Sequence, residues 1–316
     1  MAVDLAQKKI LITGADGFLG KHVVRNLLEQ RRVPRENLFL PRKKDLDLRI
    51  LENCRKAVEG REIVFHLAAN IGGIGHMKEN PGEIFYDNVV MGVQLMEAAR
   101  LAGVQKFLVV SSASAYPKSA QVPFKEEDLW AGYPDEVTAA YGLSKRMLLV
   151  QGLAYFEQYG FKSIFLIPTN MYGPENNFDP KRSGVLAALV KKFVDAKNNG
   201  TSFVEIWGTG TATREFLFVD DAAEGLALAA EQYEKPDPVN LGNGKETSIK
   251  ALAQLIAKLC KFQGEIRWDA SKPDGPPRRS LDISKAKQEF GFEAKTSLEE
   301  GLMKTIAWYE KNNHVG

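Results

Sequence analysis

The sequence predicts an α/β protein with a doubly wound parallel sheet and a smaller C-terminal lobe. Two observations lead to this prediction. Short apolar runs recur at 9–13, 37–40, 63–69 and 106–111, and helical patterns separate them. A glycine-rich turn joins the first of these runs to the first helical pattern. Short apolar strands that alternate with helices are typical of parallel sheets that helices cover on both faces.

The turn after the first strand has the spacing GxxGxxG, formed by Gly14, Gly17 and Gly20, and an apolar helical pattern begins at Val23. Glycines at this place permit a tight turn and a close approach of the backbone, so that a pyrophosphate can lie at the N-terminus of the helix. The order of strand, turn and helix therefore predicts a Rossmann dinucleotide-binding domain. A purely structural turn is the alternative.

The residues after the second strand bear on the choice of dinucleotide. Arg42, Lys43 and Lys44 precede the first acidic residue, Asp45. In NAD-selective sites a carboxylate usually binds the ribose 2′-hydroxyl group here, whereas a cation suits the 2′-phosphate of NADP. The segment therefore favours NADP, with NAD as the alternative cofactor and a solvated basic turn as the alternative interpretation.

The third strand and the residues after it supply further candidates. His66 lies inside the apolar run 63–69, where a packed or hydrogen-bonded structural role is more typical than a catalytic one. Ala68 and Ala69 at the strand end are small enough to let a cofactor approach the backbone. The glycine-rich stretch 70–76 could line a ligand cleft.

Tyr141 and Lys145 lie four residues apart and therefore on one face of a predicted helix. A phenol with an ordinary pKa of about 10 is a poor acid or base at neutral pH. A nearby ammonium group favours the phenolate and lowers that pKa. The pair is a candidate for proton transfer, although the same spacing also occurs on ordinary surface helices.

A strand that ends in Ser111 and Ser112, followed by YxxxK and preceded by the glycine motif, resembles the extended short-chain dehydrogenase/reductases of the NAD-dependent epimerase/dehydratase family. The resemblance covers the whole chain. It implies that Ser112 polarises the substrate carbonyl or hydroxyl group and that Tyr141 donates or accepts the proton. Lys145 would hold the nicotinamide ribose and lower the pKa of Tyr141. The cofactor-binding residues that it implies are Gly14, Asp16, Gly17, Phe18, Leu19, Gly20, Arg42, Lys43, Ala68, Ala69, Asn88, Tyr141, Lys145 and Pro168.

Several stretches look more narrowly like the GDP-L-fucose synthases, which epimerise C3 and C5 of GDP-4-keto-6-deoxymannose and then reduce its C4 ketone with NADPH. These stretches are 71–74, 115–118, 168–174, 177–178, 207–210, 214–216, 219–221 and 269–275, and the GDP-mannose 3,5-epimerases share several of them. The substrate-binding residues implied are Gly73, Ser112, Ser114, Ala115, Asn170, Val185, Trp207, Arg214 and Lys272. Trp207 could instead belong to the core.

The departures from these relatives narrow the expected reaction. Both relatives epimerise with a Cys and a His or Lys, and this chain has Ser114 and Gly184 at those positions. Glycine cannot move a proton, and a serine hydroxyl is a far weaker acid than a thiol. Nucleotide-sugar 4,6-dehydratases have Asp-Glu where this chain has Ala113 and Ser114. Asp16 replaces an Arg of the synthases that helps to hold the 2′-phosphate, which works against NADP.

We therefore expect NADPH-dependent reduction of the C4 ketone of a nucleotide-linked 4-keto-6-deoxy sugar, with GDP favoured and Tyr141 as proton donor. The alternatives are a nucleotide-sugar 4-epimerase with tightly bound NAD, a bifunctional GDP-L-fucose synthase, and a non-catalytic dinucleotide-binding scaffold. The resemblance also implies a homodimer, formed through the helix near Asn88 and the helix that carries Tyr141.

The second half of the chain is expected to form a nucleotide-sugar-binding lobe. Residues 1–170 form the predicted Rossmann domain, residues 171–316 the lobe, and about 215–243 return to the domain. Asp220 or Asp221 is placed to cap a helix over 222–230. Further helices are predicted over 185–194, 249–260 and 298–309, and a strand over 204–207.

Composition excludes several classes of protein. The 316 residues carry a net charge of +2, which gives no basic field for nucleic acid. No apolar run reaches the length needed to span a membrane, and the N-terminus shows no apolar signal core. Cys54 and Cys260 show no metal-binding spacing, so we expect buried thiols, no metal site and a cytoplasmic location.

Overall fold

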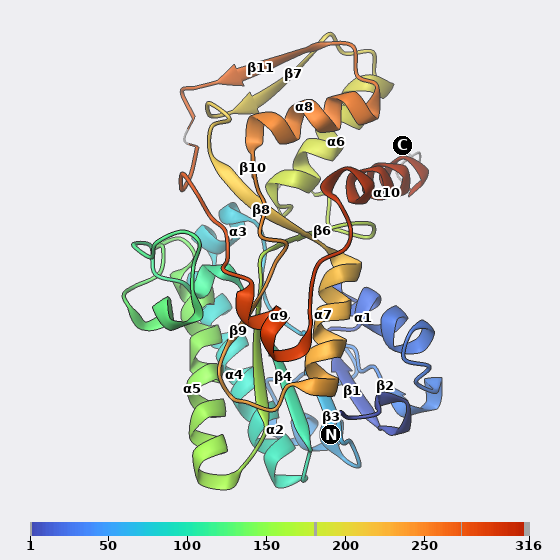
Figure 1. The fold of residues 1–316 in the computed structure, drawn as a ribbon, viewed down its shortest axis with the longest axis vertical. Coiled ribbons are helices and arrows are strands. Elements are labelled where there is room, and N and C mark those ends of the chain that lie inside the picture. Colours follow the sequence, from blue (N-terminus) through green and yellow to red (C-terminus); the bar gives the residue numbers. More distant parts are fainter. Residues whose placement is uncertain (1, 180–181, 273, 313–316) are drawn as a thin grey trace.

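The computed structural model describes residues 2–179, 182–272 and 274–312, and it confirms the predicted α/β class (Figure 1). Its larger sheet consists of β1 (Ile10–Thr13), β2 (Leu38–Phe39), β3 (Ile63–His66), β4 (Lys106–Val110), β5 (Ser163–Pro168) and β9 (Val239–Leu241). The strands are all parallel, in the order β2-β1-β3-β4-β5-β9. The order reverses between β1 and β3, and ligands of such sheets bind outside the carboxyl ends of the strands at this point.

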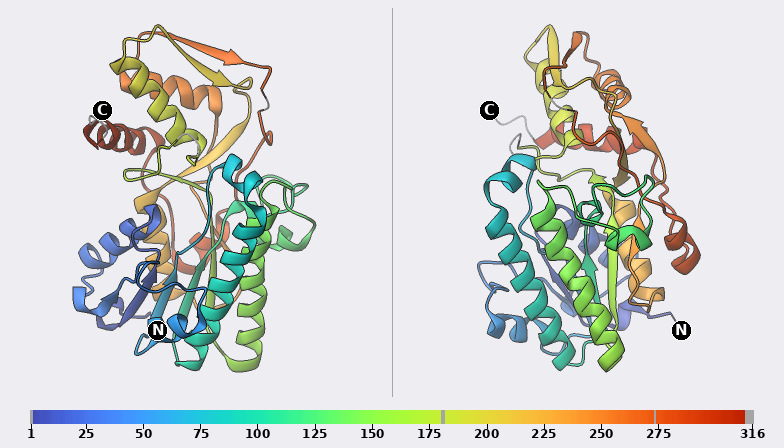
Figure 2. Two further views of the ribbon diagram at one scale, coloured as in Figure 1. Left: turned by 180° about the vertical axis from the view of Figure 1, so that it is seen from behind. Right: turned by 90° about the vertical axis from the view of Figure 1, so that its left-hand side faces the viewer.

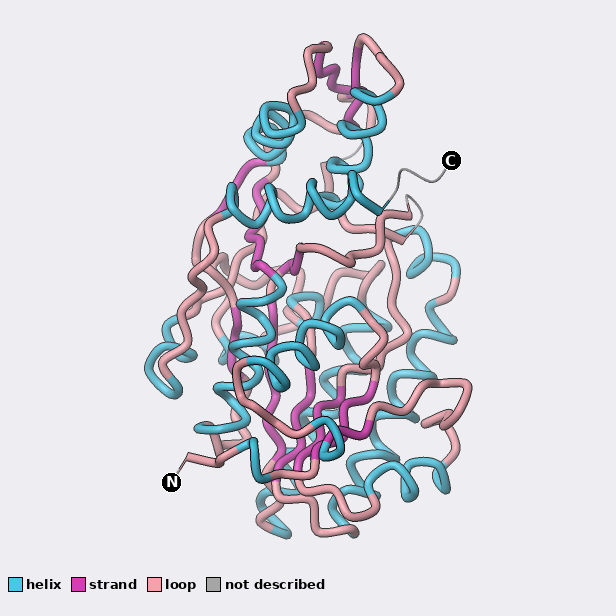
Figure 3. The backbone as a smooth tube through the Cα atoms, turned by 90° about the vertical axis from the view of Figure 1, so that its right-hand side faces the viewer, coloured by secondary structure: helices cyan, strands magenta, loops and turns pink. Residues whose placement is uncertain are grey.

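Helices cover both faces of this sheet (Figures 2 and 3). Those on one face are α1 (Phe18–Glu29), α7 (Val219–Gln232) and α9 (Ser284–Phe290), and those on the other are α2 (Leu51–Val58), α4 (Pro81–Leu101) and α5 (Ala139–Tyr159). Successive side chains of a strand point to opposite faces. Ile10 and Ile12 accordingly join the core under α1 and α7, whereas Leu11 joins the core under α2 and α4. Both faces are thus buried, as the continuous apolar runs predict.

Short helical segments connect these elements at the edges of the domain. They are η1 (Leu5–Gln7), η2 (Arg35–Asn37), α3 (Ile74–Glu79), η3 (Ala113–Ala115) and η4 (Glu126–Trp130). The third strand ends at His66, earlier than the apolar run suggested, and α3 follows the glycine-rich stretch. The imidazole of His66 is buried and hydrogen-bonded to the Thr13 hydroxyl group at 2.9 Å, which is the structural role predicted for it.

The smaller lobe stands above the carboxyl ends of the larger sheet (Figure 1). It contains the three-stranded sheet β10 (Glu246–Ser248), β8 (Thr213–Phe218), β6 (Asn170–Tyr172), the pair β11 (Glu265–Asp269) and β7 (Phe203–Trp207), and the helices α6 (Val185–Asn198), α8 (Ile249–Cys260) and α10 (Leu298–Asn312). The three helices and the inner faces of the strands enclose a separate apolar core. Helix α8 has the predicted bounds, and α6 is four residues longer than predicted.

The chain crosses between the two parts several times. After β8 it returns to the larger sheet through α7 and β9, and residues 286–292 pack there as well. The buried carboxylate of Glu215 in β8 accepts hydrogen bonds from the backbone N–H groups of Asn243, Gly244 and Leu281. This one side chain therefore fastens three segments at the junction.

The predicted cap of α7 is wrong. The helix begins at Val219 directly after β8, and no side chain caps it. Asp220 instead contacts His22 of α1, and Asp221 accepts a hydrogen bond from the backbone of Thr296. Because strand and helix join without a loop, both carboxylates fall in the first turn, where they still suit the helix dipole.

Both cysteines are buried and free, as predicted. Among the described residues, no helix combines the length and the apolar character that a membrane span requires.

Candidate active site

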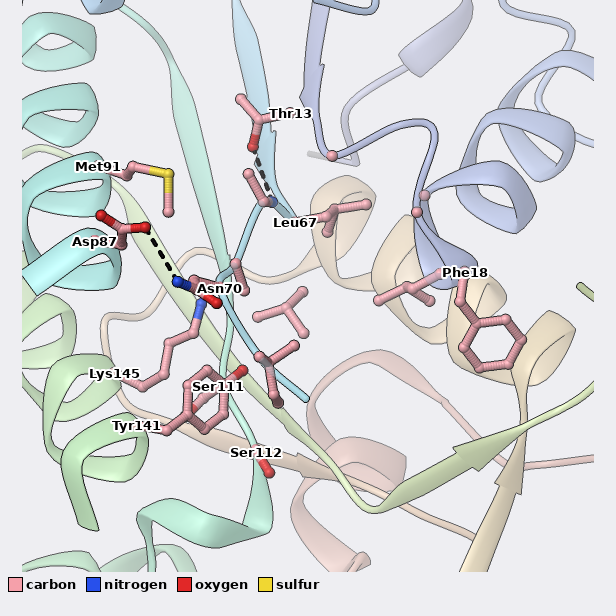
Figure 4. A pocket seen from close by; sticks show the side chains of 18 of the residues that line it. Thr13, Phe18, Leu67, Asn70, Asp87, Met91, Ser111, Ser112, Tyr141 and Lys145 are labelled. Atoms are coloured by element: carbon pink, nitrogen blue, oxygen red, sulfur yellow. Dashed lines mark hydrogen bonds between the residues drawn. The ribbon is translucent and has the colours of Figure 1, made fainter. Parts of the chain in front are cut away.

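A cavity of about 880 Å³ opens at the carboxyl ends of the parallel strands (Figure 4). Its wall includes most of the sequence-predicted residues: Gly14, Asp16, Gly17, Phe18, Leu19, Gly20, Arg42, Lys43, Ala68, Ala69, Ser112, Ser114, Tyr141, Lys145, Pro168 and Asn170. Seven predicted residues do not line it: Gly73, Asn88, Ala115, Val185, Trp207, Arg214 and Lys272.

Among the described residues, no group of three His, Cys, Asp or Glu side chains is placed to hold a metal ion.

The glycine turn forms one end of the cavity. Gly14 has a φ of +70°, and a Cβ atom there would lie 2.8 Å from the backbone nitrogen of Ala68. Only glycine therefore fits between the ends of β1 and β3. Helix α1 starts at Phe18 after Gly17, and no side chain caps its first turn. Its N–H groups remain available to an anion.

Arg42 and Lys43 line the cavity beyond this turn. The Arg42 guanidinium donates a hydrogen bond to Asp45 at 2.8 Å, and this bond raises the pKa of Arg42, with a smaller contribution from the Asp16 carboxylate. The charge of Arg42 thus interacts with two carboxylates. The basic segment offers cations to a phosphate group, and Asp16 opposes part of that attraction.

Tyr141, Lys145 and Ser112 line the same cavity (Figure 4). Tyr141 and Lys145 lie one turn apart in α5, both side chains are buried, and the Lys145 Nζ atom lies 5.7 Å from the centre of the Tyr141 ring. Ser112 follows β4. Its Oγ atom accepts a hydrogen bond from the Ser114 N–H group at 3.2 Å and lies 3.4 Å from the Ser114 hydroxyl group.

A close approach of backbones brings Ser112 and Tyr141 together. Gly142, the residue after Tyr141, packs against the carbonyl group of Ser114, and a Cβ atom there would collide with it. Arg146 on the next turn of α5 donates a hydrogen bond to the carbonyl group of Ala115. The glycine in YGxSK therefore has a packing role, and Ala115 supports the site by its backbone.

Burial is the main cause of the pKa shifts of Tyr141 and Lys145. It raises the pKa of Tyr141 above its ordinary value and lowers the pKa of Lys145 to about 8. The expectation that Lys145 lowers the pKa of Tyr141 is not met, because loss of hydration outweighs the attraction of the ammonium group for a phenolate. Tyr141 therefore stays protonated at neutral pH and can act as a proton donor.

Asn88 lies behind the cavity wall. Its side chain accepts a hydrogen bond from the N–H group of Asn70 at 3.1 Å and donates one to the Asn70 carbonyl group at 2.8 Å. The Asn70 side chain, which does line the cavity, donates to the buried carboxylate of Asp87 at 3.1 Å. Asn88 thus holds the segment after β3 in place.

Several lining residues were missed from the sequence: Asp87, Met91, Ser111, Arg182 and Arg279. Asp87 and Met91 lie one turn apart and therefore on one face of α4, beside the predicted residue Asn88. Arg182 and Arg279 reach the cavity from distant parts of the chain, for which no local signal exists.

The remaining predicted substrate residues lie on the lobe. The Trp207 side chain is 64% exposed, so the core interpretation is wrong, and the Lys272 Nζ atom lies 5.7 Å from the centre of its ring. Arg214 is held by hydrogen bonds to two backbone carbonyl groups. Val185 is exposed at the start of α6, and Gly73 precedes α3.

Ser114 and Gly184, the two positions at which the sequence analysis expects a departure from epimerising enzymes, differ in their surroundings. Ser114 lines the cavity beside Ser112. Gly184 directly precedes α6, and a Cβ atom there would lie more than 4 Å from the neighbours that the structure describes. Of Ser114 and Gly184, only Ser114 therefore has a polar side-chain group, a hydroxyl, that could contact a substrate.

The chain is also similar to known proteins over most of its length. The sequence model of the NAD dependent epimerase/dehydratase family matches residues 10–242. The chain is 36% identical over 307 residues to a probable GDP-L-fucose synthase 1 from Oryza sativa subsp. japonica, covering 96% of this chain and 92% of that protein.

Two solved structures extend the comparison. MlghC, a GDP-mannoheptose C4 reductase from Campylobacter jejuni with NADP bound, is 29% identical with a TM-score of 0.87, and the match covers 96% of this chain and 99% of that one. A GDP-L-fucose synthetase from Naegleria fowleri bound to NADP is 29% identical with a TM-score of 0.89, over 100% of this chain and 96% of that one.

Proposed function

Because this chain belongs to the NAD-dependent epimerase/dehydratase family, we propose that it uses NADPH to reduce the C4 ketone of a GDP-linked 4-keto-6-deoxy sugar. One observation carries the proposal. Ser112, Tyr141 and Lys145 are assembled around the cavity, whereas Ser114 and Gly184 occupy the positions of the epimerising pair. The relatives, which include a GDP-linked C4 reductase, support an oxidoreductase that acts on nucleotide sugars.

The cavity fits NADP, which two of the solved relatives bind. The tight turn at Gly14 and the uncapped start of α1 would hold the pyrophosphate. Arg42 and Lys43 would hold the 2′-phosphate, and Lys145 the nicotinamide ribose. When bound, the reduced nicotinamide supplies the hydride. NAD remains the alternative because Asp16 lies near Arg42.

Tyr141 supplies the proton to the C4 oxygen of the substrate. Its raised pKa keeps the phenol protonated until negative charge develops on that oxygen. Lys145 then stabilises the phenolate by its positive charge. The Ser112 hydroxyl hydrogen can rotate from Ser114 to the ketone oxygen and polarise it. General acid catalysis of this kind contributes about 10²- to 10⁴-fold in rate.

Cations near the mouth of the cavity suit a nucleoside diphosphate. Arg279 and Arg182 line the cavity. Burial lowers the pKa of Arg279, and a diphosphate would offset this loss of hydration with a charge-assisted hydrogen bond. The exposed ring of Trp207 offers an apolar face to the base.

The deciding experiment mixes the enzyme with GDP-4-keto-6-deoxymannose and NADPH in deuterated water. We expect stoichiometric loss of NADPH absorbance and a product without deuterium at C3 and C5. Deuterium at both carbons would identify a bifunctional fucose synthase. No loss of NADPH, together with cofactor-free C4 epimerisation of a GDP- or UDP-hexose, would identify a 4-epimerase. NADPH binding without turnover of any such sugar would leave only the scaffold.

We also propose that the chain forms a homodimer through α4 and α5. These helices pack side by side and expose the large apolar side chains Phe85, Tyr86 and Leu101 on α4 and Met147, Val150, Phe156 and Tyr159 on α5. Light scattering should give twice the mass of one chain. The variant Val150→Glu should give the mass of one, and a wild-type monomer would reject the dimer.

A further inference from the structure

Ser111 carries a buried hydroxyl group that has no hydrogen-bonding partner. The residue follows β4, its N–H group donates to the carbonyl group of Leu166 at 2.8 Å, and it is 3% exposed. Leaving such a group unpaired destabilises the folded protein, because it has lost its hydrogen bonds to water. Other buried side-chain atoms without partners belong to Arg61, Gln94, Arg146, Gln151 and Ser183, none of which lines the cavity. Among the described residues, Ser111 alone combines the two properties, so a ligand is the natural partner of its hydroxyl group.

A second polar group faces the same space. The Lys145 ammonium group is buried and forms no hydrogen bond with the described residues. Ser111, Tyr141 and Lys145 all line this cavity, and Figure 4 draws their side chains in the same part of it. The two groups have complementary needs, since an ammonium group only donates hydrogen bonds whereas a hydroxyl group both donates and accepts.

The neighbouring Ser112 is engaged differently. Its Oγ atom accepts a hydrogen bond from the Ser114 N–H group and caps the short helix η3. Successive side chains in extended backbone point in opposite directions. The two serines therefore divide the cavity between them: Ser112 belongs to the wall that Ser114 continues, and Ser111 to the wall formed by Tyr141 and Lys145.

A vicinal diol meets the requirements of both free groups. One of its oxygens can accept from the ammonium group, and its second hydroxyl group can pair with a serine hydroxyl group. An apolar ring would satisfy neither group, and the phosphates are expected at the glycine turn, at the other end of the cavity. The ribose beside the nicotinamide is the diol that the proposed cofactor brings to this place.

We propose that Ser111 is a cofactor-contacting residue whose hydroxyl group binds the diol of the nicotinamide-side ribose together with Lys145. This assignment rests on the proposed NADPH binding, and it adds a contact that the motif comparison does not supply.

The test measures the affinity of Ser111→Ala for three ligands by isothermal titration calorimetry. NADP⁺ contains the ribose and the nicotinamide, 2′-phospho-ADP-ribose contains the ribose alone, and adenosine 2′,5′-bisphosphate contains neither. We expect the variant to bind the first two roughly three- to tenfold more weakly, which corresponds to one neutral hydrogen bond. Binding of the third should change less than about twofold, because it does not reach Ser111.

Ser183→Ala is the matched control. It also removes a buried unpaired serine hydroxyl group, but outside the cavity wall, so all three affinities should stay at the wild-type value. The melting temperature of ligand-free Ser111→Ala should equal or exceed that of the wild type, since an unpaired buried hydroxyl group is removed.

Three outcomes would overturn the assignment. Unchanged affinity for all three ligands would mean that Ser111 touches no part of the cofactor. Weaker binding of NADP⁺ alone would place the contact at the carboxamide instead of the ribose. Equal loss for all three ligands would indicate a general distortion. If the wild type itself bound none of them, the proposed NADPH dependence would fail, which is a different result from any of these.

Discussion

The sheet domain and the smaller lobe present their candidate residues in different ways. In the sheet domain, Gly14 directly follows the buried strand β1 and Ser112 is the second residue after the buried strand β4. The close packing at Gly142 fixes the position of Tyr141 in α5. In the lobe, Trp207 ends a strand with 64% of its side chain exposed, and Val185 begins a helix with 40% exposed. The proposed catalytic residues thus lie on buried backbone elements, whereas the proposed substrate-binding residues of the lobe have exposed side chains. The difference predicts that variants of the domain change rate or cofactor binding, whereas variants of the lobe change substrate affinity.

The largest expected effect belongs to Tyr141→Phe. Turnover should fall about 10²- to 10⁴-fold, because the proton donor is lost. NADPH affinity should stay within about twofold of the wild type, since the variant keeps the ring and its packing. Steady-state rates and calorimetry measure the two quantities. Tyr133→Phe changes an exposed tyrosine and serves as the control. Wild-type turnover in Tyr141→Phe would refute the proposed mechanism.

Lys145→Met separates the stability of the domain from its chemistry. Burial lowers the pKa of Lys145 to about 8, so the folded protein binds this proton less tightly than the unfolded chain, whose lysine has a pKa of about 10.4. The free energy of unfolding of the ligand-free wild type should therefore rise by about 1–3 kcal/mol between pH 8 and pH 10.4. Below pH 8 the penalty of burying the charge is fully present.

In Lys145→Met this rise should be absent, and the ligand-free variant should be the more stable protein at pH 7. Urea unfolding at several pH values measures both effects. A wild-type curve that runs parallel to that of the variant would show that Lys145 is not buried as described.

Trp207→Ala tests the lobe. We expect KM for the GDP-sugar to rise roughly tenfold, because stacking of a base on an aromatic ring contributes about 1–3 kcal/mol. NADPH affinity should not change. Trp130→Ala removes another exposed tryptophan, the last residue of η4 in the sheet domain, and should leave KM unaltered. If Trp207→Ala instead weakened NADPH binding, the proposed division of roles would be wrong.

The smallest effect is expected at the glycine turn. Asp16→Asn should strengthen NADPH binding about two- to fivefold, because an exposed carboxylate near Arg42 is removed and exposed charge pairs contribute at most about 1 kcal/mol. NADH, which lacks the 2′-phosphate, should bind as before. The gain should shrink at high salt, where charges are screened. An equal gain for both dinucleotides would exclude an effect through the 2′-phosphate.

The sequence predicts much of the domain because its signals are local. A glycine turn between a strand and a helix, a serine at a strand end and YxxxK each specify backbone geometry within a few residues, and the structure brings them together in one cavity. The predicted cap at Asp220 or Asp221 is wrong because β8 runs directly into α7, without the loop that would place a capping residue before the helix.

The sequence does not predict contacts between residues that lie far apart in the chain. Arg279 reaches the cavity from a segment more than one hundred residues after Lys145. The absence of a partner for Ser111 is visible only once its neighbours are placed. The balance between burial and charge at Tyr141 likewise depends on the packed interior, which the spacing of YxxxK does not describe.

The open space at Gly184 has a consequence for how this enzyme could diversify. A Cβ atom gained there would displace none of the described residues, since none of their atoms lies within 4 Å of its position. The companion change at Ser114 to Cys replaces a single oxygen by sulfur. A descendant could therefore acquire the two proton-moving groups of an epimerase in two mutational steps, without rebuilding its fold. Gly184 is a point at which the chain remains evolvable, because its structure does not depend on any side chain there.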